Sequence, residues 1–205
     1  MKIIGITGGT GCGKTTALNC LAHRGARLID CDEVYHRLLE TDMALLDRIE
    51  ARFPGVVTDH VLDRKRLGSR VFSDPAELTA LNGLISDAVL TAVRAELSAA
   101  ERDNAPAAAI DAIGLVESGL GALCHVTVAV TAPEEERVLR LMRREEITEE
   151  YARLRIAAQK SNEEFSAMCD ETLCNDCPTA EAFAARCEAL FDRILENTAP
   201  EPFSI

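Results

Sequence analysis

The chain has little positive charge. Among its 205 residues, 22 Lys and Arg stand against 34 Asp and Glu, which gives a formal net charge of −12. Such a surface repels nucleic acid and anionic membranes. The sequence also lacks a run near the roughly 18 apolar residues that a membrane span needs, and Met1 and Lys2 lead into an apolar strand with no signal sequence before it. We expect a cytoplasmic protein with no nucleic-acid and no membrane partner.

The eight cysteines do not form a secretory disulfide pattern, because no signal sequence accompanies them. Cys169, Cys174 and Cys177 show the spacing C-x₄-C-x₂-C, which some iron–sulfur proteins use. However, Cys174 falls in an expected strand, Cys187 in an expected helix, and no glycine-rich loop surrounds them. We therefore predict reduced, mostly buried thiols.

Residues 8–15 match G-x-x-x-x-G-K-[ST], the phosphate-binding loop, between an apolar run at 3–7 and an expected helix at 16–22. Its glycines let successive N–H groups turn toward a polyphosphate, and the helix that follows adds its positive end. Lys14 can reach the β- and γ-phosphates, and the Thr15 hydroxyl can ligate Mg²⁺. Cys12 lies inside this loop, so modification of its thiol should block nucleotide binding.

Apolar runs at 3–7, 27–29, 107–111, 125–130 and 172–174 predict short buried strands. Helical patterns separate them, at 33–53, from about 62 to 101, at 134–168 and at 179–196. This alternation predicts an α/β fold with a mostly parallel five-stranded sheet between layers of helices.

Asp30 and Asp32 follow the second strand. Ligands of parallel sheets bind beyond the carboxyl ends of the strands, so we expect both acids near the phosphate loop, with neighbouring strands about 5 Å apart. One carboxylate can accept the proton of a substrate hydroxyl. The alternative is a helix N-cap, and the two roles are compatible if each acid takes one.

Asp111 ends its own apolar strand. An acid at this position can hold Mg²⁺ directly or through water in a nucleotide-binding fold. The alternative is an ordinary turn residue at the end of a strand.

Four arginines, Arg137, Arg140, Arg143 and Arg144, lie on one expected helix, and three of them share a face. Arginine suits the spread charge of a transferring phosphoryl group, and a lid that carries it excludes water. Glutamates are interleaved with these residues, so the alternative is a solvated face of ion pairs.

Taken together, these residues resemble the dephospho-CoA kinase family of P-loop kinases, over residues 3 to about 196. The resemblance is carried by separated motifs in a fixed order: residues 6–15, 28–32, 62–64 with 67 and 71–75, 115–120, 140–142 with 144, 155–156 with 159, and Asp170 with Leu173 and Asn175.

The resemblance implies a P-loop NTPase core at 1–61, 103–133 and 161–197, a helical CoA-binding insertion at 62–102, a lid at 134–160 and a loose tail at 198–205. ATP and dephospho-CoA are the implied substrates, with Mg²⁺. Asp32 becomes the base toward the ribose 3′-hydroxyl, and Lys14 and Arg140 the other catalytic groups. Further residues are implied to bind ATP (Gly9, Thr10, Gly11, Cys12, Gly13, Lys14, Thr15, Thr16, Arg144 and Asn175), the acceptor (Asp32, Arg64, Arg70 and Glu117) and the metal (Thr15 and Asp111).

Three positions depart from the usual family pattern. Ser86-Asp87 stands where the family has His-Pro, Ile113-Gly114 where it has Pro-Leu, and Glu145-Glu146 where it has Asp-Gly. Two of the three fall where the acceptor is expected. The alternatives to a dephospho-CoA kinase are therefore a related kinase of another nucleoside or nucleotide, and a nucleotide-binding switch without phosphotransferase activity.

Overall fold

The computed structural model describes residues 1–71 and 74–196. The chain divides into two compact units, one made of Met1–Ile29 with the chain from Ala99 onward, the other of Asp30–Ser98. The tail expected at 198–205 and two motif residues, Phe72 and Ser73, lie outside the described residues.

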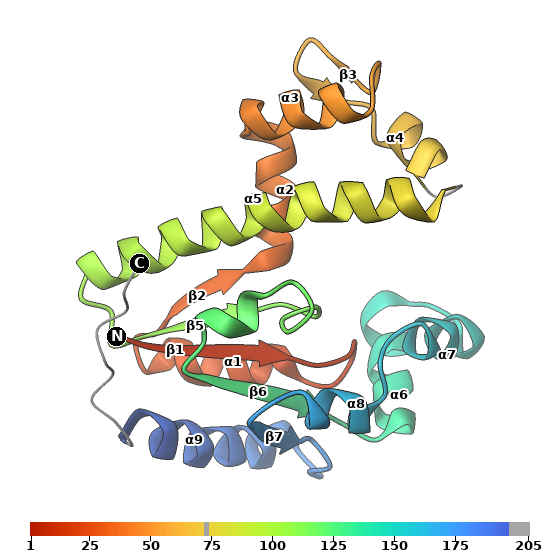
Figure 1. Cartoon of the computed structure of the whole chain (residues 1–205). Helices are drawn as coiled ribbons and strands as arrows, with labels where there is room; N and C mark the ends of the chain where they lie inside the picture. The colour runs from red at the N-terminus through yellow and green to blue at the C-terminus, as the bar shows by residue number, and fades with distance from the viewer. Residues whose placement is uncertain (72–73, 197–205) are drawn as a thin grey trace. The chain divides into compact units, whose positions relative to one another are not determined.

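A five-stranded sheet forms the centre of the first unit (Figure 1), in the order β2-β5-β1-β6-β7. The strands are β1 (Lys2–Thr7), β2 (Arg27–Asp30), β5 (Ala107–Asp111), β6 (Val126–Thr131) and β7 (Glu171–Cys174). β1 pairs in parallel with β5 and β6, and β6 pairs in parallel with β7. The predicted α/β fold and its five strands are confirmed.

The expected position of the second strand in the sheet is wrong. The sequence analysis placed the second strand next to the first, but β5 lies between β1 and β2. The chain leaves the sheet after β2 for the whole of the second unit, and the strand that returns takes the place beside β1. Asp111, at the end of β5, is thus on the strand next to the phosphate loop, in register with Ile6.

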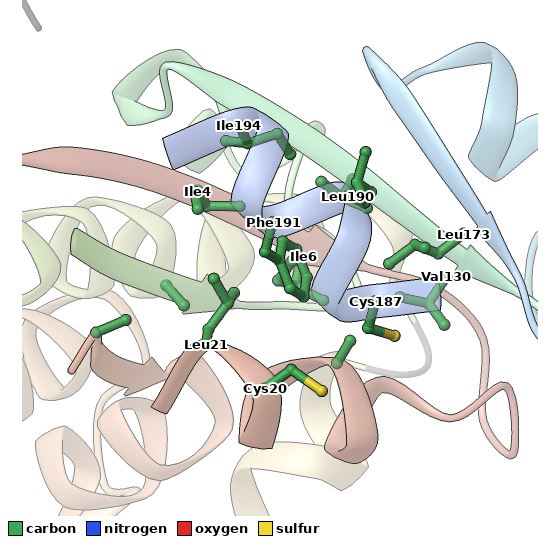
Figure 2. Close-up of a cluster of buried hydrophobic side chains, with 14 of the residues drawn as sticks. Ile4, Ile6, Cys20, Leu21, Val130, Leu173, Cys187, Leu190, Phe191 and Ile194 are labelled. Atoms are coloured by element: carbon green, nitrogen blue, oxygen red, sulfur yellow. The ribbon is translucent and has the colours of Figure 1, made fainter. Parts of the chain in front are cut away.

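The strands form because their apolar runs are buried. Figure 2 shows Ile4 and Ile6 of β1, Val130 and Leu173 meeting the apolar face of α9 (Ala180–Glu196). From α9 come Leu190, Phe191 and Ile194, and from α1 (Lys14–His23) come Cys20 and Leu21. This cluster packs α1 and α9 on the sheet and fixes where the loop before α1 begins.

The lid region predicted at 134–160 is helical, as α6 (Glu134–Glu145) and α7 (Glu149–Ala157), followed by α8 (Asn162–Ala167). Side chains define the helix starts: Thr148 caps α7, and Ser161 with Glu164 forms a capping box on α8. A short 3₁₀ helix, η1 (Leu120–Leu123), was not predicted.

The second unit contains α2 (Cys31–Thr41), α3 (Met43–Arg52), α4 (Arg64–Val71) and most of α5 (Pro75–Arg102). It also contains an antiparallel hairpin of β3 (Val57–Thr58) and β4 (Val61–Leu62), which was not predicted and of which only Leu62 falls in the segment expected to be helical from residue 62. Two-residue strands are too short to show an alternating pattern.

By length and composition, α5 is the one helix among the described residues that could cross a membrane, with a mean hydropathy of 1.2 over its most apolar window. The sequence analysis did not single it out, because Asp87 and Arg94 interrupt its apolar residues. Core helices of water-soluble proteins meet the same criterion, and Leu81, Val93 and Leu97 of α5 are buried.

Candidate active site

The phosphate loop lies between β1 and α1, as predicted, and α1 begins at Lys14. Gly13 occupies the N-cap position with a left-handed φ of 107°. A side chain could not replace its hydrogen, because a Cβ there would lie 2.4 Å from Nδ2 of Asn175. The structure thus brings eight predicted residues together, from Gly9 through Thr16, in one loop and the first turn of one helix.

Lys14 lies across this loop. Its ammonium group donates to the carbonyl oxygen of Gly8 over 3.1 Å. The side chain is half-buried, whereas Thr15 beside it is exposed. A cation fixed at the mouth of a loop of backbone N–H groups provides the charge that a bound polyphosphate needs.

The helix α6, in the segment predicted to be a lid, contacts the same loop. Arg140 donates to the carbonyl oxygen of Gly11 over 3.2 Å, and Glu136 lies 3.8 Å from its guanidinium. Arg144 is exposed and pairs with Glu145 at 2.5 Å, and Glu145 also pairs with Arg155. Arg140 therefore lies against the loop and Arg144 is in an ion pair, and the phosphate role of both arginines stays a prediction.

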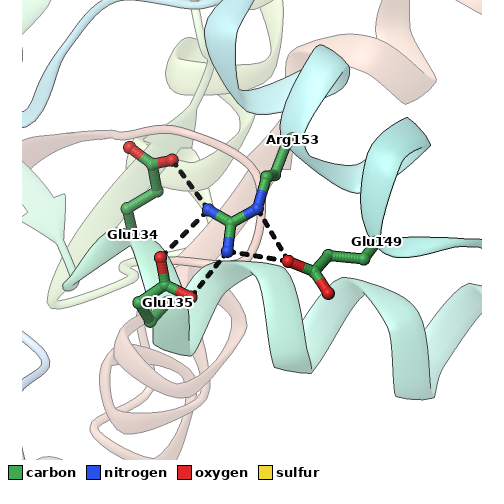
Figure 3. Close-up of polar contacts among 4 residues, drawn as sticks. All are labelled: Glu134, Glu135, Glu149 and Arg153. Carbon is green, nitrogen blue, oxygen red and sulfur yellow. Dashed lines mark hydrogen bonds and ion pairs between the residues drawn. The ribbon is translucent and has the colours of Figure 1, made fainter.

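Exposed ion pairs join the two lid helices. Figure 3 shows Arg153 of α7 between Glu149 of its own helix and Glu134 and Glu135 of α6. Hydrogen bonds from Arg153 lower the pKa of Glu135 below its ordinary value. Arg153 therefore joins α7 to α6, and the contacts with the loop come from other residues.

The residue that follows β7 supports the loop. Asn175 is 7% exposed, and its Nδ2 donates to the carbonyl oxygen of Cys12 over 2.9 Å. A pocket of about 440 Å³ lies beside it. Its lining includes Gly13, Thr16, Arg140, Asn175, Pro178 and Phe183.

Cys12 is 1% exposed, and burial raises the pKa of its thiol, with Asp111 adding to the rise and Lys14 opposing it. A protonated, buried thiol reacts slowly, since the thiolate is the nucleophile. All eight cysteines are free; four are buried and four are half-buried, so the prediction of mostly buried thiols holds for half of them. In the described part of the chain, no three His, Cys, Asp or Glu side chains gather as a metal-binding group, and this includes Cys169, Cys174 and Cys177.

Glu117 lies in the segment between β5 and η1 and forms an ion pair with Lys160. Burial is the largest single effect and acts to raise its pKa, but the hydrogen bond from Lys160, a backbone hydrogen bond and the charge of Lys160 together leave the pKa below its ordinary value. Glu117 is therefore a carboxylate held by a cation at the end of α7. Nearby, Thr7 donates to the carbonyl oxygen of Ile113, one of the unusual positions, over 2.9 Å.

Four predicted residues belong to the second unit. Asp30 is the N-cap of α2, and its Oδ1 accepts from the backbone N–H groups of Asp32 at 2.8 Å and Glu33 at 3.2 Å. Asp32 is exposed in the first turn. Arg64 lines a pocket of about 240 Å³, largely apolar, and Arg70 lies over the ring of Phe53, 5.8 Å from its centre.

Two functional contacts were missing from the predicted site residues. Arg137 and Gln159 both hydrogen bond to Thr10 of the loop. The shared face of Arg137 and Arg140 on α6 was the signal in the sequence, and Gln159 belonged to one of the family motifs. Neither pattern shows which arginine is buried.

The model of the dephospho-CoA kinase family matches residues 2–181 of this chain. The dephospho-CoA kinase of Anaeromyxobacter dehalogenans is 36% identical over 192 residues, which cover 93% of this chain and 90% of that protein. The chain belongs to the dephospho-CoA kinase family. It is therefore a kinase of P-loop fold that uses ATP, and the expected assignment to the last step of CoA biosynthesis is confirmed.

Two solved structures share the fold of this chain. A crystal structure of a Thermus thermophilus protein is 33% identical, with a TM-score of 0.75, and covers 97% of this chain and 98% of that one. The dephospho-CoA kinase from Campylobacter jejuni, 23% identical, shares the fold with a TM-score of 0.68 over 96% of this chain and 98% of its own.

Proposed function

We propose that this protein transfers the γ-phosphoryl group of ATP to the ribose 3′-hydroxyl of dephospho-CoA, which yields coenzyme A. Membership of the family supports the acceptor. The observation that carries the proposal is the meeting of two cations on one loop, Lys14 at Gly8 and Arg140 at Gly11. Phosphoryl transfer depends mainly on positioning and on cations that stabilise charge, and this loop offers both.

On the nucleotide side, the backbone N–H groups of the loop and of the first turn of α1 bind the phosphates. Residues Gly9 to Thr16 provide this cradle, and Arg144 adds a cation once the phosphates compete with Glu145 for it. The pocket beside Gly13 and Asn175 receives the base of ATP, since it adjoins the loop and has both polar and apolar walls.

Thr15 and Asp111 are the proposed magnesium ligands. Mg²⁺ prefers oxygen, keeps several waters and needs only one or two protein ligands beside the substrate phosphates. A hydroxyl at the start of α1 and a carboxylate on the neighbouring strand β5 fit that donor set. Thr15 and Asp111 would hold the ion, which would supply positive charge against the charge that develops on the phosphates.

Asp32 is the proposed general base. This proposal is supported by the capping of α2: Asp30 already caps the helix, so the carboxylate of Asp32 is not needed for capping. Arg64, Arg70 and Glu117 are proposed to bind the acceptor. Arg64 and the apolar pocket in the second unit offer a cation and an apolar wall, which suit a phosphate and the uncharged arm of dephospho-CoA.

We also propose the roles of the segments: residues 62–102 bind the acceptor, and residues 134–160 close as a lid. The relatives come from bacteria, and a cytoplasmic location is proposed for an enzyme of this step. The excess of acidic residues supports the absence of a nucleic-acid partner.

The acceptor is tested with a panel. Purified protein with Mg²⁺ and ATP receives dephospho-CoA, adenosine, AMP or shikimate in turn, and ADP release is followed. We expect release with dephospho-CoA alone. Transfer to a nucleoside monophosphate without transfer to dephospho-CoA would contradict the proposal and favour a changed acceptor.

A further inference from the structure

Arg137 is an unusual side chain, because it is charged and 3% exposed. Among residues 1–71 and 74–196, no other Lys, Arg, Asp or Glu is so deeply buried. Burying a charge is costly unless hydrogen bonds compensate it. A buried arginine therefore needs a structural reason.

The reason lies in the loop. Nε of Arg137 donates to the carbonyl oxygen of Thr10 over 2.9 Å, and one terminal nitrogen donates to Oε1 of Gln159 over 3.3 Å. The same Oε1 accepts from the backbone N–H of Thr10 over 2.8 Å. Arg137 and Gln159 thus hydrogen bond to the carbonyl and the N–H group of Thr10, and they also hydrogen bond to each other.

No carboxylate compensates this guanidinium at close range. None of the ion pairs within 4 Å in the described part of the chain includes Arg137. Its neighbours are instead neutral oxygens and the loop itself. A Cβ on Gly9 would lie 2.3 Å from the terminal nitrogen of Arg137, so the loop backbone packs directly on the guanidinium.

We propose that Arg137 is a positioning residue that fixes the Thr10 peptide of the phosphate loop, together with Gln159 at the end of α7. It acts through its hydrogen bonds, and the nitrogens engaged by Thr10 and Gln159 do not bind phosphate. The contact joins the lid helices to the loop apex, so the loop has its binding shape when α6 and α7 are seated. This inference rests on the nucleotide binding proposed above.

The chemistry of the side chains gives a sharp test. Nε2 of a glutamine is as many bonds from the backbone as Nε of arginine, so Arg137→Gln keeps a donor for the Thr10 carbonyl and loses the charge. Arg137→Lys keeps the charge but moves its nitrogen one atom farther out. Arg137→Met keeps the apolar stem and loses both.

Titration of MgADP by calorimetry measures the loop without requiring turnover. We expect Arg137→Gln to bind MgADP within about threefold of the unchanged protein, and Arg137→Met to bind roughly tenfold more weakly, because a buried carbonyl loses its donor. The KM for ATP should follow the same order, with kcat at saturating ATP changed less than threefold. Arg193→Met, at an exposed arginine of α9 that does not contact the loop, is the matched control and should bind normally.

If Arg137→Lys binds normally while Arg137→Gln is as weak as Arg137→Met, charge is what matters and the inference is overturned. Normal binding by all three variants also overturns it. An unchanged protein that does not bind MgADP would instead overturn the proposed function, and this inference with it.

Gln159 supplies a second test if Arg137→Met folds poorly. Gln159→Leu removes the other half of the contact from a half-buried position. We expect weakened MgADP binding, and a double variant with Arg137→Gln that is weaker by less than the product of the single effects, as for residues in one network. Independent, multiplicative effects would contradict the proposal.

Discussion

The side-chain amide of Asn175 donates to the carbonyl oxygen of Cys12 over 2.9 Å, so the residue after the last strand supports the phosphate loop. The resemblance to the kinase family implies that Asn175 binds ATP, which stays a prediction, and a pocket lies beside this residue. The bond adds a second role. Asn175 links the shape of the loop to the wall of the pocket.

Asn175→Asp tests this link. An aspartate has no donor for the Cys12 carbonyl and places a carboxylate at a site that is 7% exposed. We expect ATP to bind at least about tenfold more weakly, from the lost hydrogen bond and the buried charge. Calorimetric titration of MgADP measures the change. Asp176→Asn, at the exposed neighbouring position, is the control, and equal affinities for both variants would contradict the link.

Asp32→Asn tests the proposed base. Turnover should fall by about 10²–10⁴-fold, the usual contribution of a general acid or base, with ATP binding nearly intact. Asp30→Asn is the matched control, because asparagine caps helices as well as aspartate does. Steady-state rates of the two variants are measured with saturating dephospho-CoA. Near-normal turnover of Asp32→Asn would remove this residue from the base role.

Much of the fold follows from short-range signals. Five apolar runs predicted five strands, and the glycine spacing of the loop predicted its place before α1. The order of the strands could not be predicted from these signals, because nothing in the sequence between β2 and β5 indicates which strand pairs with β1. The hairpin of β3 and β4 has too few residues to show a pattern.

The site was predictable where the chain itself brings residues together, as in the loop. The site was not predictable where segments far apart in the sequence contact each other. Three arginines of α6 share a face in the sequence, but packing buries Arg137, places Arg140 against Gly11 and leaves Arg144 paired with Glu145. Charge and spacing cannot distinguish these outcomes, since they depend on the loop packed against the helix.

Glu146 ends α6 with a left-handed φ of 54°, at a position where the family usually has glycine. A non-glycine residue pays a conformational cost there. We expect Glu146→Gly to raise the free energy of unfolding by about 1 kcal/mol. Glu150→Gly, the same change inside α7, should lower it by about 0.5–1 kcal/mol. Denaturant unfolding measures both, and a loss of stability in Glu146→Gly would refute the expectation.

Asp170 joins β6 to β7 through Thr127, whose hydroxyl and N–H donate to Oδ2 over 2.7 and 2.8 Å. The side-chain bond and then the backbone bond from Thr127 hold the pKa of Asp170 below its ordinary value. A lowered carboxyl pKa contributes stability above the ordinary value of about 4, and this is lost as pH falls through the folded-state pKa.

Asp170→Asn should therefore be less stable than the unchanged protein by about 1 kcal/mol at neutral pH, since a charged acceptor is replaced by a neutral one. The difference should stay constant from pH 8 to 5 and shrink below about pH 4. Thermal unfolding across this range gives the profile. A difference that grows as the pH falls would have the wrong sign.

The most direct test of the function is a coupled assay of ADP release with Mg²⁺ and ATP, with and without dephospho-CoA, followed by mass analysis of the product. We predict release that depends on dephospho-CoA and a product heavier by one phosphoryl group, identical to coenzyme A. Protein that binds MgADP normally but releases no ADP with dephospho-CoA would contradict the account.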